Sequence, residues 1–287
     1  MSGSVLFDAP GPRARRRMAW GNLAAGVVVV GIGVYVLLLL DRKGQLDAAL
    51  WKPLFTANAW ENYFLPGLRQ TLVAAGLSIL TAGVFGLVFG LGRLASSRLV
   101  RVVCGGVVEF FRAVPVLIMM VFFYMAIPRL DVVSPKDLPL VAVVLGLTFY
   151  NGSVFAELVR SGVHSLPSGQ REAALAIGLR RSQSLWLVEV PQAVIAMLPA
   201  IASQLVVILK DTALGAIITY PELLAAARRF GSGNGNILQS LVVAAVVFVV
   251  INWLLTRVAE ALAGRVGRRT AGRARAEAPS LAVVGAD

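Results

Sequence analysis

Long runs of apolar residues, separated by short polar segments, dominate the pattern along the chain. A helix of roughly 20 apolar residues crosses the ~30 Å hydrocarbon layer of a bilayer. The runs are continuous rather than alternating, which favours transmembrane helices over the short strands of a β-barrel. Six candidate spans cover residues 18–40, 66–94, 113–128, 138–163, 191–219 and 237–262. The pattern therefore predicts an all-α fold, a polytopic bundle of about six transmembrane helices.

The first apolar run follows a basic segment, as the apolar core of a signal peptide does. The run is too long for such a core, however, and no small-residue cleavage site follows it. The polar residues Asp41, Arg42 and Lys43 end it instead. We therefore predict that residues 18–40 form a retained transmembrane helix.

Lysine and arginine residues gather at alternate ends of the runs. If the N-terminus lies inside, the inside segments hold roughly twice as many of these residues as the outside segments, which is the expected bias. Both termini are then cytoplasmic, as an even number of spans requires. Residues 1–17 form a basic cytoplasmic N-terminus. Residues 263–287 form a basic cytoplasmic tail, which we expect to be largely disordered and to lie against anionic lipid.

Composition supports the membrane assignment. The chain is 57% hydrophobic and only 15% charged, whereas a soluble domain carries about 25% charged residues. The net charge of +12 would also suit a nucleic-acid-binding protein. The positive residues stand at the ends of apolar runs, however, so we expect a lipid partner and no nucleic acid.

Several kinds of site are excluded by what the sequence lacks. Cys104 is the single cysteine and His164 the single histidine, so neither an internal disulfide nor a cluster of such ligands around a metal is expected. No phosphate-binding loop, nucleophile elbow or zinc motif is present. The chain is therefore predicted to be no enzyme, and to hold no catalytic residue, metal or cofactor of its own.

Glycines in the second span have the spacing of a helix-packing motif. Gly86 and Gly90 are four residues apart, so they lie on one helix face. Small residues at this spacing let two membrane helices approach closely. We expect packing within or between subunits here rather than contact with a ligand.

The segment 165–190 is too polar to span the bilayer, yet it carries helix signals. Glu172 falls in a first helical turn, where a carboxylate complements the helix dipole. Gly178 suits a helix end, and Pro191 suits the first turn of the following span. We therefore predict two short amphipathic helices, joined at Gly178. From the residues alone, this loop is either an interfacial anchor or a docking element.

One spacing in this loop favours docking. Glu172-Ala173-Ala174, Gly178 and Val188-Glu189-Val190-Pro191 stand in an order that resembles the signature loop of binding-protein-dependent ABC importer permeases. The resemblance implies that the loop is a coupling helix that docks in a cleft of a separate ATP-hydrolysing subunit. The residues assigned to this coupling loop are Gln170, Glu172, Ala173, Ala174, Gly178 and Pro191.

Three further segments resemble the polar amino acid branch of that family. They are Glu109–Pro115, Asn151–Gln170 and Lys210–Leu214. In the last of these Ala213 replaces the usual serine, so a hydroxyl role there is not carried over. The resemblance covers about residues 63–262 and implies a five-span core, to which the helix 18–40 is an addition. With this addition the chain resembles the longer permeases of the family, which include many for acidic amino acids. Glutamate is therefore the first expectation, with glutamine or arginine as alternatives.

Polar residues inside the spans are candidates for the substrate path or its gate, because ionisable groups there usually face the bundle interior or a cavity. These candidates are Asn151, Glu157, Lys210, Asp211 and Thr212. Glu157 is equally compatible with a self-neutralising pair with Arg160, three residues later. Lys210 and Asp211 are adjacent and point in different directions, so each needs its own partner, either for an interhelical or gate contact or for substrate.

The resemblance also implies the assembly. Its members are a second permease subunit, the same or different, an extracytoplasmic amino-acid-binding protein, and an ATP-binding subunit that carries ATP and magnesium. The expected location is the bacterial inner membrane. Two other classes stay open: an ion-driven secondary transporter, for which no inverted repeat with broken helices is visible, and a channel-like or structural membrane protein.

Overall fold

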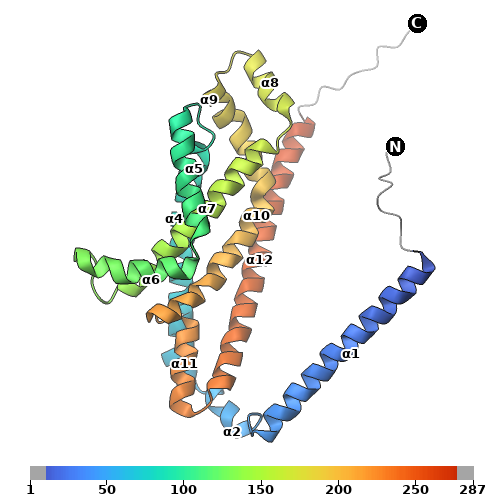
Figure 1. Cartoon of the computed structure of the whole chain (residues 1–287), viewed down its shortest axis with the longest axis vertical. Helices are drawn as coiled ribbons and strands as arrows, with labels where there is room; N and C mark the ends of the chain where they lie inside the picture. Colours follow the sequence, from blue (N-terminus) through green and yellow to red (C-terminus); the bar gives the residue numbers. More distant parts are fainter. Residues whose placement is uncertain (1–10, 277–287) are drawn as a thin grey trace.

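The computed structural model describes residues 11–276, whose regular elements are all helices (Figure 1). Residues 1–10 and 277–287, parts of the predicted terminal segments, lie outside the described residues. The elements are α1 (Pro12–Arg42), α2 (Ala48–Trp51), η1 (Lys52–Phe55), α3 (Ala57–Ala59), η2 (Trp60–Phe64), α4 (Leu65–Gly92), α5 (Arg98–Ala113), α6 (Val116–Ala126), η3 (Ile127–Leu130), α7 (Leu138–His164), α8 (Ser168–Ala176), α9 (Arg181–Ser184), η4 (Leu185–Glu189), α10 (Val190–Asp211), η5 (Thr212–Ile218), α11 (Leu223–Asn234) and α12 (Ile237–Ala276).

Five helices of the described part are long and apolar enough to cross a membrane, and a bent pair of helices makes a possible sixth span. The predicted all-α membrane bundle is thereby confirmed. The five helices are Pro12–Arg42, Ala57–Gly92, Leu138–His164, Arg181–Ile218 and Ile237–Ala261.

The predicted third span is not one straight helix. Helix α6 has only 11 residues, about 16 Å, which is too short to cross the membrane alone. Helix α5 precedes it, and the two meet at an angle of 98°. The cause is Pro115, which lacks an N–H donor and biases the preceding residue toward extended backbone. Val114 indeed has ψ 126°.

The core lies between α4 and α7, which pack closely because of small residues. A side chain at Gly86 would collide with Phe155, and one at Gly90 would lie 2.9 Å from the Cβ atom of Val159. The predicted glycine motif therefore serves packing within this chain. It brings the ends of α4 and α7 together beside α8.

Helix α12 continues beyond the predicted end of the sixth span at residue 262 and is helical to Ala276, although its apolar, membrane-crossing part ends at Ala261. This is a correction for residues 263–276, which were expected to be disordered. Alanine and arginine have high helix propensity, and no proline interrupts the segment before Pro279.

Helix α1 stands apart from the other helices. None of its residues is buried, and in Figure 1 it projects away from the bundle. Helices α8 and α9 lie at one end of that bundle and α11 at the other (Figure 1). The two ends therefore present different surfaces.

Candidate functional site: a braced helix at one end of the bundle

Helix α8 ends where the sequence predicts but begins earlier: it starts at Ser168, so Glu172 is its fifth residue and no acidic residue lies in its first turn. Its N-cap is Pro167, and it ends in a left-handed turn at Gly178, where φ is +87°. The Gly178 N–H donates to the Leu175 carbonyl, and the Leu179 N–H donates to the Ala174 carbonyl. This is the Schellman arrangement, in which glycine meets no steric penalty.

The second predicted short helix is not separate. Helix α9 continues through η4, a π-helical turn, into α10, so that Arg181–Ile218 is one long helix. Pro191 is the second residue of α10 and lies inside this continuous helix rather than opening it. The π turn η4 widens the helix just before Pro191, and π turns and prolines are both common sites of irregular helix geometry.

Glu189 fastens α8 to this long helix. It is 4% exposed, and its carboxylate accepts a hydrogen bond from Arg171 Nε at 3.1 Å and from Ser184 Oγ at 2.9 Å. The Arg171 Nη2 atom also lies 3.1 Å from it. Gln192 Nε2 adds a hydrogen bond of 3.2 Å to Gln170 Oε1. The docking assignment omitted Glu189 and Arg171, although Glu189 stood within the recognised motif.

The predicted coupling residues divide into two groups. Ala174 is buried and faces the bundle. The others are exposed, namely Gln170, Glu172, Ala173, Gly178 and Pro191. Ile177 extends the exposed face and is 79% exposed. Leu175 is exposed as well, at 45%, so apolar side chains gather at the tip of this braced helix, as they do at sites that contact a partner.

Glu157 belongs to an ion network. Its Oε2 atom lies 2.7 Å from Arg93 and 3.3 Å from Arg112, and its Oε1 atom lies 2.5 Å from Arg160. Glu109 joins the network through Arg93, at 3.3 Å. The predicted pair of Glu157 and Arg160 is present, within a larger cluster that ties α4, α5 and α7 together.

The other path candidates lie apart from Glu157. Asn151 is buried, and its Oδ1 atom accepts a hydrogen bond of 2.6 Å from Gln204, which joins α7 to α10. Thr212 is buried and donates to the Leu209 carbonyl. Lys210 is exposed and Asp211 half-buried, and neither forms a salt bridge with the side chains that the structure describes in residues 11–261. No side-chain hydrogen bond or ion pair joins these five candidates to one another in that range.

A buried acid that the sequence reasoning missed lies at the opposite end, outside the five candidate spans. Glu222 is fully buried, and its carboxylate caps α11 by accepting from the N–H groups of Leu224 and Ala225. Burial raises the pKa of Glu222 to about 7, because it disfavours the charged form. Burial likewise raises the pKa of Tyr220 to about 12, and its hydroxyl donates to the Gln70 carbonyl.

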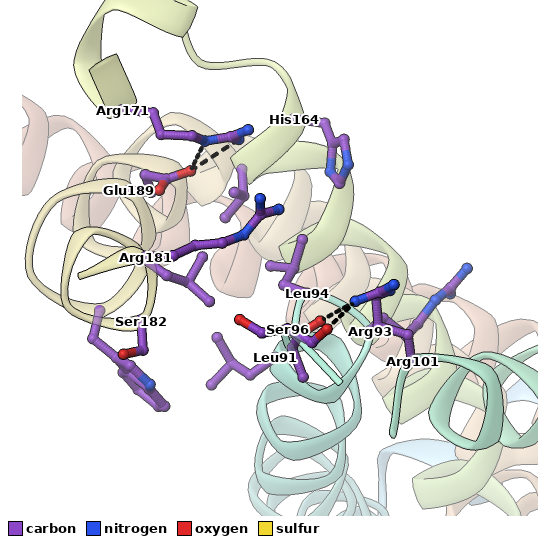
Figure 2. A pocket seen from close by; sticks show the side chains of 14 residues that line it. Leu91, Arg93, Leu94, Ser96, Arg101, His164, Arg171, Arg181, Ser182 and Glu189 are labelled. Atoms are coloured by element: carbon purple, nitrogen blue, oxygen red, sulfur yellow. Dashed lines mark hydrogen bonds and ion pairs between the residues drawn. The ribbon is translucent and has the colours of Figure 1, made fainter. Parts of the chain in front are cut away.

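A cavity of about 870 Å³ adjoins the base of α8 (Figure 2). Its lining comes from the end of α4, the segment before α5, the end of α7, and the α8–η4 region. The lining residues are Leu91, Arg93, Leu94, Ala95, Ser96, Arg101, Val163, His164, Arg171, Arg181, Ser182, Leu185, Trp186 and Glu189.

A family model matches this region and most of the bundle. Its description is "Binding-protein-dependent transport system inner membrane component", and it matches residues 82–268. The matched stretch contains α7, the α8–η4 region and α10.

Relatives of known name resemble the chain over most of its length. It is 47% identical to the glutamate transport system permease protein GluD of Corynebacterium glutamicum, over 83% of this chain and 86% of that protein. It is 32% identical to the probable glutamine ABC transporter permease protein GlnP of Bacillus subtilis, over 68% of this chain and 90% of that protein.

Solved structures share the fold. A chain from an amino acid ABC transporter crystallised with histidines superposes with a TM-score of 0.65 at 23% identity, over 72% of this chain and 95% of that chain. A chain from a bacterial ABC transporter that imports alginate superposes with a TM-score of 0.61 at 14% identity, over 88% and 96%. At these identities the likeness concerns the fold.

Proposed function

Since the chain belongs to the family of binding-protein-dependent transport system inner membrane components, we propose that it is the permease subunit of an ATP-driven amino acid importer. It forms part of the path through which the amino acid crosses the membrane. None of the comparisons supports the ion-driven alternative.

The observation that carries the proposal is the exposed face of α8 on a braced base. Glu172, Ala173 and Ile177 project from the end of the bundle, while the ion pair between Arg171 and the buried Glu189 ties the helix to α10. A helix held in this way transmits a displacement to the spans rather than pivoting freely. It suits a docking element better than a passive interfacial anchor.

The partner at this face is a separate ATPase subunit. The chain has no phosphate-binding loop of its own, so ATP and magnesium bind to that subunit. ATP-driven closure of the ATPase moves α8 and biases the permease between two states that open to opposite sides. This role places α8, and with it both termini, on the cytoplasmic side of the bacterial inner membrane, in agreement with the bias of lysine and arginine.

The path also needs a second permease subunit, which is either a copy of this chain or a relative, and a binding protein that delivers the amino acid at the α11 end. Glutamate is the substrate that we propose, because the GluD relative is a glutamate permease by name and is 47% identical to this chain over 238 residues. Glutamine stays the second candidate, in line with the GlnP relative.

The five path candidates take different roles in this proposal. Glu157 is held by three arginines, so we assign it to the architecture of the cytoplasmic end. Asn151 couples α7 to α10 through Gln204. Lys210 is the exposed cation among them, and it is the candidate for a substrate carboxylate, with Asp211 and Thr212 beside it.

The docking role is tested by Ala173→Trp. Ala173 is exposed, so the bulky side chain leaves the fold intact but blocks close approach of a partner. We expect co-purification of the ATPase with the permease, and glutamate uptake, to fall at least about tenfold, as loss of a central interface contact does.

The control is Ser232→Trp, on exposed α11 at the opposite end. It introduces the same bulk and leaves ATPase co-purification unchanged. Wild-type co-purification and uptake in the Ala173→Trp variant would refute the docking role. Competition of glutamate uptake by glutamine and arginine, in a strain without its own importer, tests the substrate separately.

A further inference from the structure

The cavity beside α8 is lined by more positive than negative groups. Four arginines and His164 face it, whereas Glu189 is the one carboxylate among its lining residues within 11–276. The four arginines are Arg93, Arg101, Arg171 and Arg181. Its volume of about 870 Å³ falls within the roughly 300–1,000 Å³ of pockets that bind small molecules.

Two of these arginines have their charge matched. Arg171 is paired with Glu189 at 3.1 Å. Arg93 is paired with Glu157 at 2.7 Å and with Glu109 at 3.3 Å, and neither of these carboxylates lines the cavity.

The other two arginines keep an unmatched charge. The Nη1 atom of Arg101 donates to the backbone carbonyls of Ala95 at 2.7 Å and Ser96 at 2.6 Å, which orient the guanidinium without neutralising it. Arg181 is exposed and forms no salt bridge with any residue of the described chain. In Figure 2 its side chain extends between the Arg171–Glu189 pair and Leu94. The cavity therefore carries an excess of positive charge with free N–H donors.

Apart from Ser96 and Ser182, the remaining lining is apolar and aromatic. Leu91, Leu94 and Leu185 line the cavity, and Trp186 is 57% exposed beside them. Tryptophan prefers the interface between lipid and water. Guanidinium groups bind phosphate oxygens in bidentate fashion, and basic pockets between membrane helices accept anionic head groups.

We propose that this cavity binds a phosphate group, presented either by an anionic phospholipid of the adjacent leaflet or by a soluble phosphate compound. Arg181 and Arg101 are its main ligands, and the leucines with Trp186 contact the glycerol or other carbon portion. The bound anion joins the α4–α5 connection to the α8–η4 region. This inference takes one premise from the proposed function, namely the side of the membrane that the cavity faces.

The test uses the full-length permease with the subunits that accompany it, without the ATPase, in lipid nanodiscs. Phosphatidylglycerol retained per permease is measured by native mass spectrometry after exchange into phosphatidylcholine. Inorganic phosphate is titrated separately into phosphatidylcholine nanodiscs by calorimetry. The variant is Arg181→Gln. Its matched control is Arg180→Gln, which removes the same charge from an exposed neighbour that does not line the cavity.

We expect Arg181→Gln to reduce retained phosphatidylglycerol about fivefold, as loss of one arginine near a membrane surface does, while Arg180→Gln leaves it unchanged. If inorganic phosphate alone binds, and Arg181→Gln but not Arg180→Gln weakens that binding, the phosphate group comes from a soluble compound instead. Equal behaviour of the two variants, or no binding of either probe, overturns the proposal. Reduced ATPase co-purification in Arg181→Gln without binding of either probe would overturn it too, by assigning the cavity to the ATPase. None of these outcomes bears on docking by Ala173, which is measured independently.

Discussion

Arg171 and Glu189 are 18 residues apart in the chain, yet their side chains meet at the base of the exposed helix. Arg171 is half-exposed, whereas Glu189 is almost fully buried. A buried carboxylate is costly unless it is paired and hydrogen-bonded, and Arg171 and Ser184 supply those partners. The pair therefore fixes the angle at which α8 leaves the bundle.

A double-mutant cycle with Arg171→Met and Glu189→Met measures this interaction. We expect each single change to lower the free energy of unfolding, and the pair to show a coupling energy of about 1–3 kcal/mol, between the values for exposed and buried pairs. Denaturation in detergent micelles gives the energies. Arg180→Met serves as the control for loss of a nearby positive charge. Strictly additive losses would show that the two side chains do not interact.

Glu222 predicts a pH dependence of stability. Burial raises its pKa to about 7 in the folded protein, above the value near 4.3 expected when the chain is unfolded. The folded state therefore binds the proton more tightly. The stability gained in this way is complete below about pH 4, is lost as the pH rises toward 7, and is absent above that.

The corresponding variant is Glu222→Gln, which stays neutral at every pH. We expect the free energy of unfolding of the wild type to fall by up to ~3 kcal/mol between pH 4 and 8 relative to this variant. The exposed residue Glu61 provides the control, since Glu61→Gln should keep the wild-type profile. Parallel pH profiles of wild type and Glu222→Gln would contradict the assignment.

Among the elements, the α4–α7 contact depends on Gly86. Its position against Phe155 leaves no room for a side chain, so Gly86→Leu must separate the two helices or unfold them. We expect the yield of folded, monodisperse protein in size-exclusion chromatography to fall severely, as overpacking of a core does. Gly76→Leu, on the same helix with open space around it, is the matched control. Equal yields of the two variants would refute the close contact.

The elements that follow from local rules could be predicted from the sequence. Apolar runs gave the long spans, and the glycine at 178 marked the end of α8, because a left-handed turn there favours glycine. The spacing around Glu172 and Gly178 also indicated the residues that we propose for docking, and most of them are exposed. Each of these signals lies within a few residues of the feature that it specifies.

Some features were missed, one of them of local origin and the others dependent on contacts between distant segments. The 98° bend before α6 has a local cause in Pro115, but apolar content alone favoured a single span there. The π turn that joins α9 to α10 lies just before Pro191, and neither this turn nor the pairing of Glu189 with Arg171 follows from the apolar pattern. The positive cavity forms only where α4, α7 and α8 meet, so no pattern along the chain predicted it.

At the scale of the whole molecule, α1 contributes little to folding. None of its residues is buried, so its removal exposes almost no apolar surface of the bundle. We expect a variant that begins at Gly44 to unfold in detergent within about 2 °C of the full chain. Thermal unfolding followed by circular dichroism checks this, with the Gly86→Leu variant as a destabilised reference. A larger drop would mean that α1 supports the fold.

The unbroken helix from Arg181 to Ile218 has a mechanical consequence. At 1.5 Å per residue its 38 residues extend about 55 Å, from the base of α8 to a point beyond Lys210. The places where such a rod can bend are the π turn Leu185–Glu189 and Pro199. Between them and beyond them a tilt of a few degrees at one end becomes a displacement of several ångströms at the other, as in a lever, and the stiffness of these two places sets how far the motion reaches.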